Sequence, residues 1–214
     1  MALTVIQTCN INSGSTFTSA SVGFPSGNTP GNLLVAGWRV TAGSPAITVT
    51  DSAGNTWNTI TQSASGVCGM AWAPCTFAAA ANVVTWHTPS AGFPRVIFAE
   101  VTYGSTGVTT WTQPSASGAA IGATTTPNSG TISDLTTDLL IGVAANQTDG
   151  TNLSTTWTTI YNMNTWDPTL AYHAATGSDA FFGTSGSASW GIAIANFRPT
   201  ITSGGTKASQ QIFF

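Results

Sequence analysis

The chain has 214 residues, of which 42% are apolar and only 5% are charged, and its formal net charge at pH 7 is −3. This composition excludes disorder driven by charge, because a chain with so many apolar residues can bury a core. Four Lys and Arg residues cannot neutralise many phosphates, so we expect no binding to nucleic acid. No apolar run approaches the roughly 18 residues that a membrane-spanning helix needs, so we expect no membrane insertion.

The strand pattern is that of an all-β protein. No window of about 11 residues shows helical apolar spacing without Gly, Pro or Thr runs. Short β-branched and aromatic runs alternate instead with turn residues, and Asp51-Ser-Ala-Gly54-Asn55 marks a hairpin turn. The predicted strands, in chain order, are Leu3–Thr8, Asn32–Val40, Ala46–Asp51, Thr56–Ser63, Cys68–Pro74, Asn82–His87, Arg95–Tyr103, Gly130–Ser133, Leu139–Asn146, Thr156–Asn162, Thr169–Ala174, Ala180–Gly183 and Ser189–Phe197.

An internal repeat organises these strands. Asn32-Leu-Leu-Val-Ala recurs as Asp138-Leu-Leu-Ile-Gly, and Thr-Trp57-Asn-Thr-Ile recurs 100 residues later as Thr-Trp157-Thr-Thr-Ile. We predict one two-sheet antiparallel β-sandwich, jelly-roll-like, over residues 1–199, followed by an extended C-terminal tail at 200–214. The pseudo-repeats, at about 30–105 and 136–199, are expected to interleave, because neither half would bury both of its faces alone.

Five runs in these segments carry a family resemblance: Pro30-Gly-Asn-Leu-Leu-Val, Val-Thr-Asp51-Ser-Ala-Gly-Asn-Thr-Trp57, Val-Ile-Phe-Ala-Glu100-Val-Thr-Tyr103-Gly-Ser, Asp138-Leu-Leu-Ile-Gly and Ala193-Ile-Ala-Asn-Phe-Arg-Pro. With them the chain resembles a poorly characterised family of β-sandwich proteins. Members of that family occur in bacteria and their phages, some as modules of larger surface or virion proteins. The resemblance covers about residues 28–199, implies the fold and brings no catalytic motif with it.

The cysteines indicate neither disulfides nor a metal site. Cys9, Cys68 and Cys75 are odd in number, and an extended strand would hold the last two too far apart to bridge. No Cys-x-x-Cys pair accompanies His87 and His173, which lie in unrelated strand segments. We therefore expect buried thiols, no metal and no cofactor.

Glu100 is the only glutamate and lies inside an apolar run, where a partly buried carboxylate would suit a general acid. Glycoside hydrolysis usually needs a second carboxylate about 5–10 Å away, and no Asp shows a recognisable spacing to Glu100. We expect a structural role instead, with Arg39 or Arg95 as partner or in a network of hydroxyl groups. The chain is therefore not expected to be an enzyme.

The other polar candidates also have structural explanations. Neither His87 nor His173 accompanies a Gly-x-Ser-x-Gly elbow, so we expect no serine-hydrolase triad. Turn oxygens of Asp51, Asn55 and Asp149 could bind calcium, but the EF-hand spacing is absent. An Asx turn explains Asp51 without a metal.

Two tryptophans are candidates for a contact with a glycan or another subunit. Trp111 and Trp166 lie in loop-like segments, where an exposed ring can stack on a sugar or anchor a partner. The other tryptophans are expected in the core, because they lie in the repeat or in apolar strands: Trp38, Trp57, Trp72, Trp86, Trp157 and Trp190.

The low charge and the tail predict assembly. A surface of Thr, Ser, Ala and Gly suits subunit packing, where an unpaired charge is costly to desolvate. The tail is polar and ends in Ile212, Phe213 and Phe214, which we expect to dock either on a neighbouring subunit or on the protein's own core.

We therefore expect a homo-oligomeric structural subunit of a phage virion, of the capsid decoration, coat or fibre type, with other virion or surface proteins as partners. The N-terminal run Met-Ala-Leu-Thr-Val-Ile-Gln-Thr-Cys has no basic region and begins no apolar stretch of 7–15 residues, so we expect no Sec signal peptide. Synthesis in the host cytoplasm and location in the virion follow, with an extracellular or cell-surface location as the alternative. The alternative functions are a lectin-like carbohydrate-binding module, a non-viral surface filament subunit and, last, a glycan-active enzyme built on Glu100.

Overall fold

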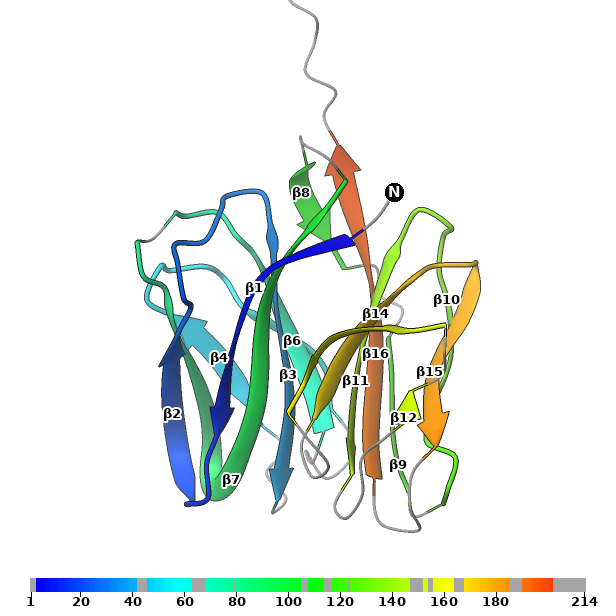
Figure 1. The fold of residues 1–214 in the computed structure, drawn as a ribbon, viewed down its shortest axis with the longest axis horizontal. Coiled ribbons are helices and arrows are strands. Elements are labelled where there is room, and N and C mark those ends of the chain that lie inside the picture. The colour runs from blue at the N-terminus through cyan, green and yellow to red at the C-terminus, as the bar shows by residue number, and fades with distance from the viewer. Residues whose placement is uncertain are drawn as a thin grey trace, which may run out of the picture.

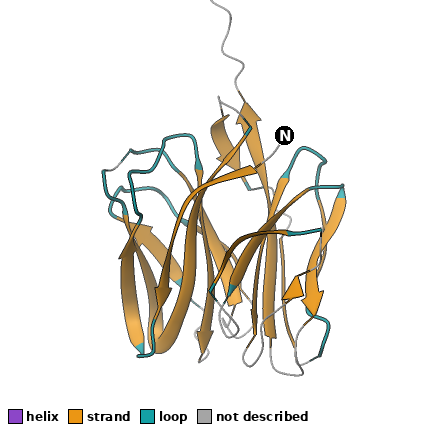
Figure 2. Ribbon diagram, viewed as in Figure 1, coloured by secondary structure: helices purple, strands orange, loops and turns teal. Residues whose placement is uncertain are grey.

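A computed structural model gives the fold of the chain. It describes residues 3–41, 46–62, 68–78, 80–104, 108–113, 117–122, 124–146, 152–153, 156–163, 168–184 and 190–201. Every regular element in these ranges is a β-strand and none is a helix, as Figure 2 shows. Antiparallel sheets pack face to face, so the predicted all-β sandwich is confirmed.

The first half of the chain builds a seven-stranded sheet. Five of its strands follow the order β1, β7, β3, β6, β5, while β2 and β4 pair with the remaining part of β7. All of these pairs are antiparallel. The bounds are β1 Leu3–Asn12, β2 Phe17–Gly23, β3 Leu33–Thr41, β4 Thr48–Asp51, β5 Asn58–Gln62, β6 Cys68–Pro74 and β7 Val83–Tyr103.

Strand β7, 21 residues long, belongs to two layers. It pairs with β4 as far as His87 and with β2 as far as Gly92; it pairs with β3 from Phe93 onward and with β1 from Arg95 onward. Figure 1 shows β2 and β4 as the outermost layer on the left, with β7 running from it into the next layer. The sequence predicted two separate strands here, Asn82–His87 and Arg95–Tyr103. The predicted break is wrong, because Pro89 and Pro94 both lie within the single strand β7. Pro94 lies close to the point where the strand passes from one layer to the next, and a proline, which has no N–H to donate to the neighbouring strand, is tolerated there.

The second half builds a six-stranded sheet and a three-stranded sheet. The larger sheet follows the order β13, β14, β11, β16, β8, with β9 also paired to β16, and the smaller follows β10, β15, β12. In Figure 1 the smaller sheet is the outermost layer on the right. The bounds are β8 Val108–Thr112, β9 Ser117–Gly122, β10 Asn128–Ser133, β11 Leu139–Asn146, β12 Asn152–Leu153, β13 Thr158–Asn162, β14 Thr169–Ala174, β15 Ser178–Thr184 and β16 Trp190–Ile201.

Three apolar cores separate the four layers of strands. The middle core joins the two inner sheets, and each outer core joins an inner sheet to the layer that covers it. Both faces of an inner strand are therefore buried, which explains continuous apolar runs such as Leu33–Val35. Representative residues are Val35, Ile97, Ile141, Val143 and Phe197 in the middle core, Trp38, Trp86 and Phe98 in the first outer core, and Trp157, Phe181 and Trp190 in the second.

The two inner sheets approach closely at glycines. A Cβ added to Gly37 on β3 would lie 3.0 Å from side-chain atoms of Val143 and of Leu170 in the opposite sheet. A Cβ on Gly191 would lie 2.5 Å from that of Cys68. Small residues at these positions therefore allow the sheets to pack at their observed separation.

The two inner sheets share one strand order. The order β5, β6, β3, β7 in the first half corresponds to β13, β14, β11, β16 in the second. Among the described residues, each strand pairs only with strands of its own half, so the halves meet through side chains rather than by exchanging strands. The repeat in the sequence remains a prediction, and the shared strand order is an independent observation compatible with it.

Four observed strands have no counterpart in the sequence prediction: β2, β8, β9 and β12. They are short, and β2 and β9 consist largely of Ser, Thr, Ala and Gly, which also populate loops. Their pairing depends on strands β7, β15 and β16, which only the tertiary structure places beside them.

Candidate functional site

Glu100 is a fully buried charge on β7. The loop between β2 and β3 closes over it, and β1 borders it on the other side. Its two carboxylate oxygens accept four short hydrogen bonds. The donors are the side-chain amides of Gln7 (2.6 Å), Asn28 (2.7 Å) and Asn32 (2.6 Å) and the backbone N–H of Thr29 (2.8 Å).

All four donors are neutral, so hydrogen bonds rather than an ion pair stabilise this buried charge. The expected partnership with Arg39 or Arg95 is wrong. Strand alternation turns both arginines toward the middle core side of their strands, opposite to the face that carries Glu100. The expected network exists, but amides take the place of hydroxyls. Because four donors occupy the carboxylate, its role in this structure is to hold the β2–β3 loop on the sheet.

A second buried carboxylate, Asp138, lies directly before β11 in the second half. It accepts hydrogen bonds from the Leu135 backbone N–H (3.1 Å), the Asn196 amide (2.9 Å) and two guanidinium nitrogens of Arg198 (2.7 and 3.0 Å). Burial opposes ionisation of Asp138, but the hydrogen bonds, those from Arg198 first, outweigh it and hold its pKa below the usual value.

These two clusters occupy equivalent places with the acid and the amide exchanged. Asn32 and Asp138 each precede a Leu-Leu strand, and Glu100 and Asn196 each pair with the second leucine of that strand. In the first half the Asn32 amide donates to Glu100, whereas in the second half the Asn196 amide donates to Asp138. Each half therefore keeps one buried carboxylate beside one buried amide, on opposite strands.

The backbone around the two clusters matches as well. The residue before each Leu-Leu strand donates its N–H to the carbonyl oxygen three residues earlier, to Thr29 at 3.1 Å and to Leu135 at 2.8 Å. Its own carbonyl oxygen accepts the N–H of Cys75 at 2.9 Å in the first half and of Ala175 at 3.2 Å in the second. The acid and the amide are thus exchanged within a backbone arrangement that the two halves share.

Asp51 forms the predicted Asx turn. One carboxylate oxygen accepts the backbone N–H of Asn55 at 3.0 Å. The other accepts the side-chain N–H groups of Asn55 (2.8 Å), Trp57 (3.0 Å) and Asn82 (3.1 Å). Within the described residues no group of three or more His, Cys, Asp or Glu side chains is placed to hold a metal. Asp149, the third predicted turn oxygen, lies outside these residues.

The two histidines lie in different halves. His87 on β7 is 3.0 Å from the Thr50 hydroxyl. His173 on β14 packs its ring against Trp157, with centroids 5.4 Å apart, and its Nε2 lies 3.8 Å from Asp179. Asp134, directly after β10, accepts the Gly177 N–H at 2.7 Å. Burial raises the pKa of Asp134, an effect that this hydrogen bond offsets in part and the neighbouring Asp179 reinforces.

Of the residues predicted to contact a glycan or another subunit, the structure describes only Trp111. Trp111 lies on strand β8 rather than in a loop, is only 4% exposed, and donates its indole N–H to the Gly31 carbonyl at 2.9 Å. Its ring is therefore covered, and it could touch a glycan or a subunit only if β8 moved. Trp166 and the tail residues Ile212, Phe213 and Phe214 lie outside the described residues.

All three cysteines are buried and none forms a disulfide, as the sequence predicted. Burial raises the pKa of the Cys9 thiol to about 12. Burial, followed by the charges of Glu100 and Asp51, raises that of Cys75 to about 11. Burial also raises the pKa of Cys68, although the nearby Arg39 opposes the shift. These thiols are core side chains rather than reactive groups.

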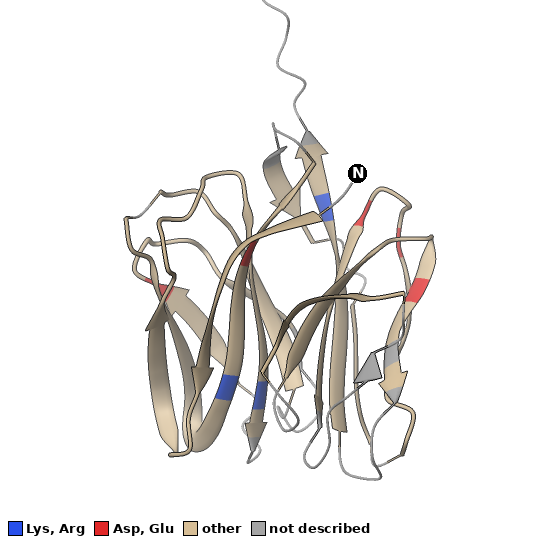
Figure 3. Cartoon of the chain, viewed as in Figure 1, with Lys and Arg blue, Asp and Glu red and all other residues tan. Residues whose placement is uncertain are grey.

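The described surface carries almost no charge. Every Asp, Glu and Arg side chain in the described ranges is buried or half-buried, and none is fully exposed. Figure 3 shows the acidic positions toward one end of the stacked layers and two of the three described arginines toward the other. Large apolar side chains do reach solvent: Ile6, Phe17, Phe77, Val83, Phe93, Ile121 and Leu135, each at least 39% exposed. The candidate functional feature is therefore this neutral surface with its exposed apolar residues.

No protein family, curated protein or solved structure matches the chain. No helix in the described part of the chain is long and apolar enough to cross a bilayer.

Proposed function

We propose that the protein is a structural subunit that works by packing against copies of itself, as a capsid decoration, coat or fibre-type component of a phage virion. The observation that carries this proposal is the neutral described surface, on which large apolar side chains are exposed and charged ones are not. A protein that stays monomeric usually keeps surface charge, because charge prevents association. A subunit in an assembly benefits from an uncharged surface, because each charge buried at an interface must be desolvated.

The end strands supply a physical mode of association. β1 ends the first inner sheet, and its Ile6 is 46% exposed; β9 flanks β16 in the second, and its Ile121 is also 46% exposed. Proteins commonly block such edges with Lys or Pro, yet the single lysine of this chain is Lys207 in the tail. Association along these strands, by backbone pairing or by apolar contact, follows from that lack of protection.

The apolar end of the tail supports the same proposal. Ile212, Phe213 and Phe214 follow a polar segment and gain roughly 1.5–3 kcal/mol each when they are buried. We propose that they dock on a neighbouring subunit, as a hook that strengthens the contact made by the edges. The partners are then other copies of the chain or other virion proteins. A non-viral surface filament would use the same contacts.

Light scattering coupled to size exclusion, at micromolar protein, tests the proposal. We expect an oligomer for the parent chain, dissociation for Ile6→Lys and Ile121→Lys, and weaker association after deletion of residues 210–214. Thr125→Lys is the matched control, because it adds the same charge at an exposed turn position between β9 and β10. A monodisperse monomer for the parent chain, or equal loss of association in the control, would overturn the proposal. Capsid or tail genes beside the gene would assign the assembly to a virion.

A further inference from the structure

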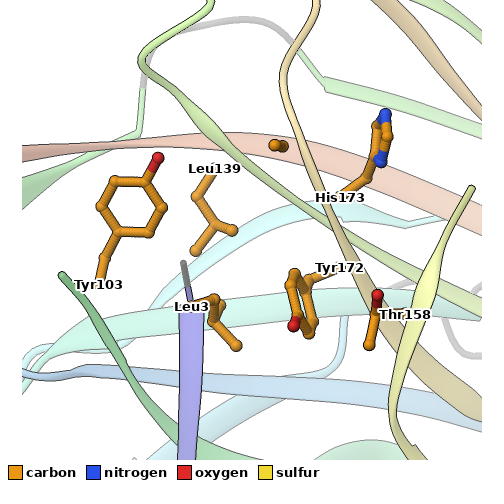
Figure 4. Close-up of a pocket in the computed structure, with 7 residues that line it drawn as sticks. Leu3, Tyr103, Leu139, Thr158, Tyr172 and His173 are labelled. Atoms are coloured by element: carbon orange, nitrogen blue, oxygen red, sulfur yellow. The ribbon is translucent and has the colours of Figure 1, made fainter. Parts of the chain in front are cut away.

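A pocket of about 280 Å³ lies at the seam between the two halves. Its walls come from both: Leu3 and Tyr103 from β1 and β7 of the first half, and Leu139, Thr158 and Tyr172 from β11, β13 and β14 of the second. Figure 4 shows Tyr103 on one side of the pocket, and Tyr172 and Thr158 on the other. At about 30 Å³ per water, the volume equals roughly nine waters, which suits one small ring-shaped molecule.

Tyr103 is the central observation. The residue is only 8% exposed, and its ring packs edge-on against Trp111, with centroids 6.5 Å apart. Trp111 is itself fixed by its hydrogen bond to the Gly31 carbonyl. Nevertheless the Tyr103 hydroxyl has no hydrogen-bond partner among the described residues, and it is not sealed from solvent. A buried tyrosine normally finds a partner for its hydroxyl, so this one is available to a bound molecule.

The other polar groups of the lining are also neutral. Tyr172, half-buried, and Thr158, exposed, each bring a hydroxyl to the opposite wall. His173 lines the pocket, but its side chain points away from Tyr172 and Thr158 in Figure 4, toward Trp157 and Asp179. Among the residues that the structure describes, no Asp, Glu, Lys or Arg belongs to the lining. A charged ligand would therefore lose its hydration without gaining a counter-charge, which excludes ions as the natural occupant.

We propose that this seam pocket binds a neutral, polyhydroxylated ring, a single hexopyranose unit of a saccharide. The aromatic and leucine side chains would cover the apolar face of the ring, while the hydroxyls of Tyr103, Tyr172 and Thr158 would bond its hydroxyl groups. This site differs from the one predicted at Trp111 and Trp166. It does not depend on assembly, because all of its walls belong to one chain.

The test is titration of the ¹⁵N-labelled protein with methyl glycosides of glucose, galactose, mannose and N-acetylglucosamine, followed by NMR. We expect at least one glycoside to bind in the millimolar range, with shifts at residues that line the pocket. Tyr103→Phe removes only the hydroxyl and should weaken binding roughly three- to tenfold, the effect of one hydrogen bond. Cyclohexanol serves as an apolar comparison of similar size and should bind more weakly than that glycoside.

Tyr161→Phe is the control, because this β13 tyrosine lies outside the lining and its hydroxyl already accepts a hydrogen bond from Asn10 at 3.0 Å. We expect it to leave glycoside binding unchanged. Absence of pocket shifts with every glycoside would overturn the proposal. So would equal affinities for Tyr103→Phe and the parent, or tighter binding of cyclohexanol. Oligosaccharides that end in the bound sugar then distinguish a polymer end from a free monosaccharide as its source.

Discussion

The exchange of acid and amide between the two halves can be tested by engineering one arrangement into the other half. Glu100→Gln removes the buried charge, and Asn32→Asp introduces a carboxylate at the position that Asp138 occupies in the second half. The double variant would reproduce in the first half the arrangement found in the second: a carboxylate before the Leu-Leu strand and an amide on the closing strand. We expect each single substitution to be costly and the double substitution to be partly rescued.

The loss of unfolding free energy expected for Glu100→Gln follows from the four hydrogen bonds to Glu100. Glu100→Gln replaces one oxygen by an NH₂ group, so two of the four donors lose their acceptor. At about 1.5–3 kcal/mol for each hydrogen bond to a charged group, the loss is about 3–6 kcal/mol. That is a large share of a typical unfolding free energy of about 5–15 kcal/mol. The side-chain nitrogen of Asn32 lies 2.6 Å from Oε1 of Glu100, so Asn32→Asp would place a second carboxylate against the first. Because two negative charges at this distance repel each other, we expect a comparable loss of unfolding free energy at neutral pH.

Urea unfolding followed by tryptophan fluorescence measures these free energies for the parent, both single variants and the double variant. We expect the double variant to be at least ~2 kcal/mol more stable than the sum of the single losses predicts, because the new amide donates to the new carboxylate. Asn128→Asp is the control: this exposed residue accepts the Gly130 N–H through its side-chain oxygen, so the substitution should change stability by less than ~0.5 kcal/mol. If the loss in the double variant equals the sum of the two single losses, the proposed equivalence of the two clusters is refuted.

Three further predictions concern packing, pH and thiol reactivity. Gly142→Ala would press a Cβ into the ring of Phe181 and should cost about 1–3 kcal/mol in thermal unfolding, whereas Gly14→Ala, with open space around it, should be nearly neutral. The pKa of Asp138 in the folded protein lies below its unfolded value of about 3.9. The ionised carboxylate therefore stabilises the fold above about pH 3.9, and this stabilisation is lost as the pH falls through the folded pKa. Asp138→Asn should flatten the acid side of a plot of unfolding free energy against pH, and an unchanged plot would contradict this prediction. Because burial raises the pKa of Cys75 to about 11 and those of the other two thiols further, a thiol reagent at pH 8 should titrate three groups only after unfolding, and rapid reaction of the folded protein would show that a thiol is accessible.

Much of the fold could be predicted because both faces of the inner strands are buried. Continuous apolar runs such as Leu139–Asn146 leave few alternatives to a buried strand. The edge strands were not predicted because their Ser, Thr, Gly and Ala residues gain little from burial, and their pairing depends on neighbours distant in the sequence. The continuity of β7 was missed for a related reason: a proline at a layer crossing costs less than a proline in a flat sheet.

The environment of Glu100 could be predicted only in part. Strand alternation alone separates Glu100 from Arg95, since the two residues are five positions apart and an odd offset places side chains on opposite faces of a strand, so this signal was available to exclude the ion pair. The amide donors could not be identified, because Gln7 and Asn28 come from segments 93 and 72 residues away. The seam pocket was missed because no local pattern joins Tyr103 to Tyr172; only the packing of one half on the other brings them together.

The continuity of β7 gives the two ends of the molecule different local opening behaviour. The layer formed by β2 and β4 is hydrogen-bonded to a strand whose other part lies between β1 and β3, so it cannot separate without disturbing the central sheet. The layer formed by β10, β12 and β15 pairs only within itself among the described residues and contacts the central sheets through side chains. Under native conditions, amide hydrogens of β10 and β15 should therefore exchange through a low-energy opening of that sheet alone, while those of β2 and β4 exchange only with global unfolding.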